Sequence, residues 1–120
     1  MVLSCCEIAA KRARVAENDE VRDALELLRG EADAAARRSA SARLEALAAD
    51  LDGVYLNAYQ RAGEQRTSEV DELFSAARAV AAIAFALQGD LHGDEEAIYE
   101  AYAACNGDLE LPFAAGELLN

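Results

Sequence analysis

Apolar residues recur along this chain every three or four positions, the spacing that places them on one face of an α-helix. The first such segment opens with Ser4 and Glu7, whose separation of three residues predicts a capping box at a helix N-terminus. We expect this helix to run to about Ala16. Its apolar face falls out of register with that of the next segment, so a break is predicted between Glu17 and Glu20.

Polar residues and glycines mark the ends of the next two segments. Asn18 is a suitable N-cap for a second helix, which Gly30 should end. A longer helix follows and ends at Gly63, while its start stays open between Glu31 and a restart at residues 39–41. Its apolar stripe comprises Ala40, Leu44, Leu47, Leu51, Val54, Tyr55, Ala58 and Ala62.

An unbroken apolar run over residues 79–87 distinguishes the fourth segment. Thr67 or Ser68 caps the helix that contains it, which we place at about residues 69–88. A helix that is apolar on all sides is typically covered on all sides, so this one is predicted to be the centre of the fold. We expect Ala81 and Ala84 to be nearly inaccessible.

The last clear helix is predicted to start at Gly93 and Asp94 and to end at residues 106–107. Pro112 then disfavours helix, and we expect residues 108–120 to form a tail that packs on the bundle. The inward face of this helix is predicted to comprise Ala97, Ile98, Ala101, Tyr102 and Cys105.

Composition supports an all-helical chain. Among 120 residues there are 29 alanines, but only 7 glycines and 1 proline, too few turn formers for a sandwich or barrel. The length suits one domain over residues 1–120. We therefore predict an all-α fold, a compact bundle of four to five helices with a buried, alanine-rich central helix at about 69–88.

The three cysteines, Cys5, Cys6 and Cys105, have no disulfide spacing and are expected to be free thiols in a reducing compartment. Cys5 and Cys105 fall on apolar stripes, so we expect them to be more buried than Cys6. A charged leader with a long apolar stretch is lacking at the N-terminus, and no apolar run is long enough to span a bilayer. The expectation is a cytoplasmic protein without a membrane partner.

The sequence gives little support to an enzymatic or cofactor-dependent function. His92 is the single histidine, and no serine or cysteine lies in a nucleophile motif. Residues 90–96 are rich in acids but do not match a calcium-binding loop. A zinc site using the cysteines fits poorly, because neighbouring positions on a helix point about 100° apart. We expect no catalytic, cofactor or metal residues.

Charge is distributed unevenly. Residues 1–60 carry 11 acids and 8 bases, whereas residues 61–120 carry 12 acids and 3 bases, and no lysine or arginine follows Arg78. Such a balance opposes nucleic-acid binding and favours a basic protein surface as partner. A general acidic bias of composition is the alternative, and the sequence leaves both open.

The leading functional hypothesis is a small acidic protein-binding module, of which an inhibitor of immunity-protein type is one form. Two alternatives stay open. One is a metal- or small-ligand-binding protein that uses the 90–96 loop and the tyrosines. The other is a homo-oligomeric structural protein, in which the bases at residues 11–14 meet the acidic half of another subunit. The candidate partner-binding residues are Asp94, Glu95, Glu96, Tyr99, Glu100, Tyr55 and Tyr59.

Overall fold

The computed structural model describes residues 2–105, and within that range every regular element is an α-helix. The five helices are α1 (Val2–Arg12), α2 (Asp19–Arg29), α3 (Ala34–Arg61), α4 (Ser68–Ala86) and α5 (Leu91–Ala104). The predicted all-α bundle is confirmed. The expected tail at 108–120 lies outside the described residues.

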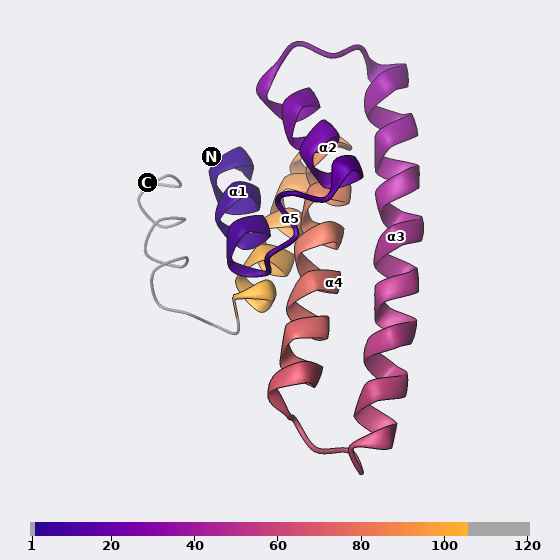
Figure 1. Ribbon diagram of the computed structural model, residues 1–120. Coiled ribbons are helices and arrows are strands. Elements are labelled where there is room, and N and C mark those ends of the chain that lie inside the picture. Colours follow the sequence, from indigo (N-terminus) through magenta and orange to yellow (C-terminus); the bar gives the residue numbers. More distant parts are fainter. Residues whose placement is uncertain (1, 106–120) are drawn as a thin grey trace.

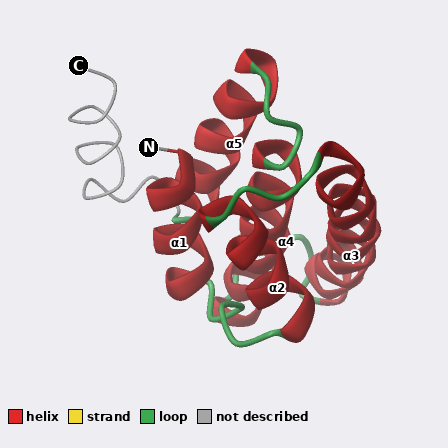
Figure 2. Cartoon of the chain, turned by 90° about the horizontal axis from the view of Figure 1, so that it is seen from above, coloured by secondary structure: helices red, strands yellow, loops and turns green. Residues whose placement is uncertain are grey.

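Helix α4 is the centre of the bundle, as predicted. It contacts each of the other four helices. Seen from above, it lies between α3 on one side and α1 and α5 on the other, while α2 crosses at the upper end (Figures 1 and 2). Within the described residues, α3 contacts only α4 and α2.

The molecule therefore has two regions of different thickness. The upper one, here called the body, contains α1, α2, α5, residues 34–52 of α3 and residues 78–86 of α4. The lower one, here called the arm, is the antiparallel helical hairpin of residues 53–77, which extends beyond α2 (Figure 1). The main core cluster lies in the body and excludes the buried arm residues Ala58, Val70 and Ala77.

Two of the predicted caps are confirmed and two helix starts are corrected. The Asn18 side chain accepts from the amides of residues 20 and 21, and the Thr67 hydroxyl accepts from that of residue 70. Ser4 is not a cap, because α1 already begins at Val2 and packs its first turn against the core. α5 begins two residues before Gly93.

The end of α1 differs from the expectation, and the structure defines the start of α3, which the sequence left open. α1 ends at Arg12 rather than near Ala16, and Arg14 adopts a left-handed conformation (φ 61°) that turns the chain toward α2. The start of α3 is set by Asp33, whose carboxylate accepts a hydrogen bond from the amide of residue 36 at 2.7 Å. Val54, expected inside, is exposed because α4 covers this part of α3 on one side only.

Alanines make up five of the nine buried residues of α4 and let α3 approach closely. Ala79, Ala82, Ala84 and Ala86 are fully or almost fully buried. Ser41 of α3 lies near enough to donate a hydrogen bond to the backbone carbonyl of Ala84 at 2.8 Å. The burial of Ala84 is confirmed. Ala81 is only partly buried, because it faces a groove described below.

The predicted order of cysteine burial is wrong. All three thiols are free and buried, but Cys6 is the most enclosed, at 0% exposure, and Cys105 the least. The reason is that α1 contacts three helices, α2, α4 and α5, so its covered face is wider than one stripe. Burial raises the pKa of Cys6 to about 12, and the neighbouring Cys5, Asp94 and Glu7 add to this rise.

Candidate functional site

The outer side of α5 carries three of the five large hydrophobic residues that the described structure exposes. Leu91, Tyr99 and Tyr102 are 75%, 67% and 42% exposed. Tyr99 and Tyr102 follow Leu91 by eight and eleven residues, which places all three on one face of the helix. Glu95 lies on the same face. We call Leu91, Glu95, Tyr99 and Tyr102 the α5 face.

Packing on the opposite side fixes the orientation of α5. The Asp90 carboxylate caps the helix by accepting from the Gly93 amide at 2.6 Å. Gly93 approaches α4 so closely that a Cβ there would lie 2.6 Å from the Phe85 carbonyl oxygen. Ala97 and Ala101 are fully buried farther along the same side. The α5 face is thus presented on a helix held at both its start and its middle.

The sequence-predicted acids on α5 divide into two groups. Glu95 is exposed on the α5 face, while Asp94 and Glu96 are half-buried at its flanks. Glu100, expected on the surface, is buried at 8% exposure on the opposite side of the helix. Tyr102, expected inside, is exposed instead. Glu100 turns inward because its carboxylate pairs with a cation on α4.

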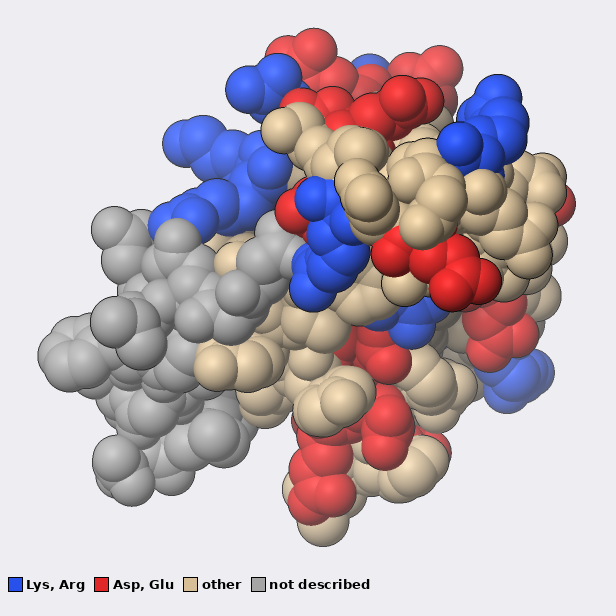
Figure 3. Space-filling model, turned by 90° about the horizontal axis from the view of Figure 1, so that it is seen from below, with Lys and Arg blue, Asp and Glu red and all other residues tan. Residues whose placement is uncertain are grey.

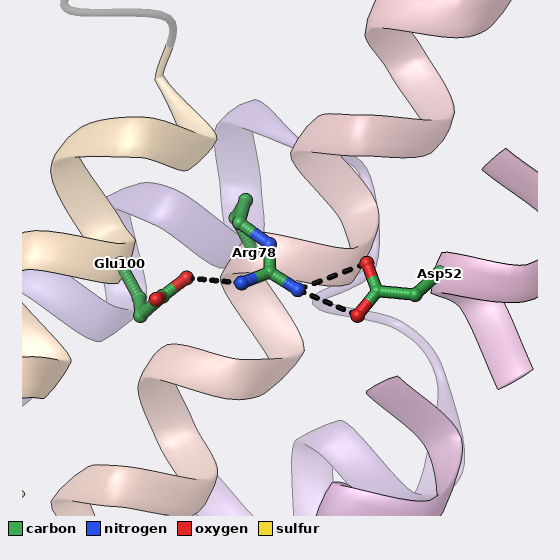
Figure 4. Close-up of polar contacts among 3 residues, drawn as sticks. All are labelled: Asp52, Arg78 and Glu100. Atoms are coloured by element: carbon green, nitrogen blue, oxygen red, sulfur yellow. Dashed lines mark hydrogen bonds and ion pairs between the residues drawn. The ribbon is translucent and has the colours of Figure 1, made fainter. Parts of the chain in front are cut away.

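That cation is Arg78, which joins three helices (Figure 4). One guanidinium nitrogen, Nη1, donates to Glu100 of α5 at 2.7 Å. The other, Nη2, donates to both carboxylate oxygens of Asp52 of α3 at 2.9 and 2.8 Å. We call these three residues the Arg78 cluster. Counts of charge by segment do not reveal this cluster, because one guanidinium can serve two carboxylates from distant segments.

The predicted tyrosine pair on α3 is separate from the α5 face. Tyr55 and Tyr59 stack with ring centroids 6.0 Å apart, and Tyr55 packs against Phe74 of α4 at 5.4 Å. The guanidinium groups of Arg66 and Arg78 each lie 5.9 Å from the Phe74 ring centroid. These rings hold the arm together, and since α3 does not contact α5 in the described structure, they do not join the predicted acids in one site.

A groove that sequence reasoning did not identify runs between α3 and α4. It has a volume of about 280 Å³. Four alanines, Ala48, Ala49, Ala81 and Ala84, supply most of its apolar lining. The remaining lining residues are Glu45, Asp52, Arg78 and Phe85. The sequence does contain alanines at helical spacing on both helices. Such spacing indicates that two helices can approach closely, but it does not show where a groove remains between them.

The 90–96 segment is not a loop. Asp90 is a helix cap and residues 91–96 form the first turns of α5, so these acids lie around a helix rather than converging. Across residues 2–105, histidine, cysteine and acidic side chains do not gather in threes as a metal site would need. Viewed from below, acidic and basic side chains are interspersed over the upper part and the centre of the molecule, while acids predominate toward its lower edge (Figure 3).

The chain matches no known protein family, no curated protein and no solved structure. In the part of the chain that the structure describes, no helix has both the length and the apolar character needed to cross a bilayer.

Proposed function

We propose that this chain is a non-enzymatic, cytoplasmic protein-binding module that uses the α5 face against a basic protein surface. The observation that carries the proposal is the gathering of Leu91, Tyr99 and Tyr102 on one exposed helix face. Isolated exposed hydrophobic residues need no explanation, but a group of them with two tyrosines is typical of an interface.

The chemistry of the face supports both affinity and selectivity. Tyrosines bury a large apolar ring and retain a hydroxyl for hydrogen bonding, which suits them as anchors in interfaces. Glu95 lies among them, Asp94 and Glu96 flank them, and residues 79–105 contain no lysine or arginine. A negative surrounding of this kind accelerates encounter with a basic partner and disfavours an acidic one.

A second copy of the chain is the other candidate for the basic partner. Lys11, Arg12 and Arg14 are exposed at and after the end of α1. Sedimentation of the purified protein at low and high salt separates this case from a foreign partner. Association of like chains that salt reverses would assign the α5 face to self-assembly.

The proposal is tested by capture from native lysate at low salt, followed by elution with a salt gradient. We expect a partner that the native chain retains and that Tyr99→Ala loses, with Glu95→Gln eluting at lower salt. Matched controls are Leu56→Ala, which removes an exposed hydrophobic side chain from the arm, and Glu69→Gln, which removes an exposed acid from α4. Capture of nothing, or equal capture by all variants, overturns the proposal.

A further inference from the structure

We infer that the groove between α3 and α4 is a binding site for a short aliphatic diamine. This site lies apart from the α5 face and does not depend on the protein-binding function. Its floor and walls are made chiefly of alanine methyl groups, with the Phe85 ring at one side. A small-molecule site commonly combines such an apolar lining with a few placed polar groups.

The polar groups of the groove lie at its two ends on α3. Glu45 and Asp52 are seven residues apart, which corresponds to two helical turns and roughly 10 Å along the axis. Between them on the same helix lie Ala48 and Ala49. The arrangement is a short apolar channel with a carboxylate at each end. An alkyl chain with an ammonium group at each end matches both features.

The charges around the groove select a cation over an anion. Arg78 is the only base among the lining residues, and its two terminal nitrogens are already bonded to Asp52 and Glu100. Its Nε is buried, and only 21% of its side-chain surface is exposed. Glu45 is exposed, and Asp52 keeps 41% of its side-chain surface exposed while paired. An incoming anion would meet carboxylates, whereas an ammonium group would find open acceptors.

The Arg78 cluster also holds the Asp52 end of the groove in place. Because Arg78 ties α4 to both α3 and α5, the Asp52 carboxylate is fixed relative to the alanine floor without any ligand. A site ordered in advance loses less entropy on binding. Glu45 at the other end is free to adjust to the length of the chain between the two ammonium groups.

The experiment is a calorimetric titration of the whole protein at low salt with 1,5-diaminopentane, pentylamine and 1,5-pentanediol. The three probes share a five-carbon chain and carry two, one and no charges. We expect saturable binding of the diamine, binding of pentylamine about tenfold weaker, and no heat from the diol. Equal binding of the diol, or no binding of the diamine at millimolar concentration, overturns the inference.

Matched variants on α3 separate this site from general attraction to an acidic protein. Ala49→Leu fills the groove and should abolish diamine binding, whereas Ala46→Leu, also exposed but outside the groove, should not. Glu45→Gln should weaken diamine binding about tenfold, to the level of pentylamine, and Asp50→Asn should leave it unchanged. If Ala49→Leu binds the diamine as the native protein does, the interaction is only a general electrostatic attraction to an acidic protein, and the inference is overturned. Glu95→Gln on the α5 face should have no effect, which keeps this test independent of the protein-binding proposal.

Discussion

The body and the arm of this molecule pack their helices together with different kinds of side chain. In the body, α4 is covered by several helices, and alanines make up many of its buried positions beside Val80 and Ile83. In the arm, aromatic rings fill the contact between α3 and α4, with Tyr59 stacked on Tyr55 and Phe74 tilted against Tyr55. Alanine side chains thus suit a helix that several neighbours enclose, whereas aromatic rings join the helices where the enclosure is less complete.

The Arg78 cluster lies where the two regions meet. Asp52 is the last body residue of α3, and Arg78 follows the last arm residue of α4. The Arg78 guanidinium also lies over the Phe74 ring of the arm. The cluster thus connects the enclosed region with the open one, and it is the natural place to test whether they unfold together.

The largest difference between the regions should appear when a buried alanine is enlarged. Ala82→Leu, at a body position with 0% exposure that does not line the groove, should lower the free energy of unfolding by about 3 kcal/mol. Ala58→Leu, at a buried position of the arm, should cost about 1 kcal/mol, since the two helices can separate slightly. Chemical denaturation of both variants provides the measurement. Equal losses would show that the arm is packed as rigidly as the body.

Removal of the Arg78 guanidinium should have the next largest effect. Arg78→Met leaves the buried Glu100 carboxylate without a cation and should cost about 2 kcal/mol. We expect hydrogen exchange to accelerate over residues 53–77 more than in α1. The double variant Arg78→Met with Glu100→Gln should recover part of the loss, because no charge is then left buried. Uniform acceleration along the chain would mean that the cluster does not separate the regions.

Glycine replacements should affect the regions in opposite directions. Gly53 lies at the start of the arm in mid-helix, and a Cβ there would meet nothing within 4 Å. Gly53→Ala should therefore raise the free energy of unfolding by about 0.5–1 kcal/mol. Gly93→Ala in the body should lower it, because the Phe85 carbonyl occupies that space. Thermal denaturation of both variants checks the signs, and a stabilised Gly93→Ala would contradict the close approach of α5.

The smallest effect concerns thiol reactivity in the body. Cys6 should be the last cysteine modified in the native protein, since burial holds its pKa at about 12 and the thiolate is the reactive form. Ionisation also favours the unfolded chain, so stability should fall as pH rises above about 9 toward 12. Mass spectrometry after timed alkylation gives the order of modification. Early labelling of Cys6 would show that α1 detaches readily.

Local features of this fold could be predicted from the sequence, and contacts between distant residues could not. Helix spacing, the Asn18 and Thr67 caps and the central position of α4 follow from nearby residues alone. The burial of Cys6 and the inward turn of Glu100 depend on which helices cover α1 and α5. In the candidate site, Tyr99 and Glu95 were predicted to be accessible, but the gathering of Leu91 and Tyr102 beside them required the true start and rotation of α5.

The place of α1 in the body has a consequence for synthesis on the ribosome. α1 is made first, yet its contacts are with α2, α4 and α5, and α5 begins roughly 80 residues after α1 ends. At typical translation rates of about 5–20 residues per second, synthesis reaches α5 roughly 4–16 s after α1 is complete. Until then the buried residues of α1, which are Cys5, Cys6, Ala9 and Ala10, lack part of their cover, so the nascent chain offers a chaperone a site that the folded protein conceals.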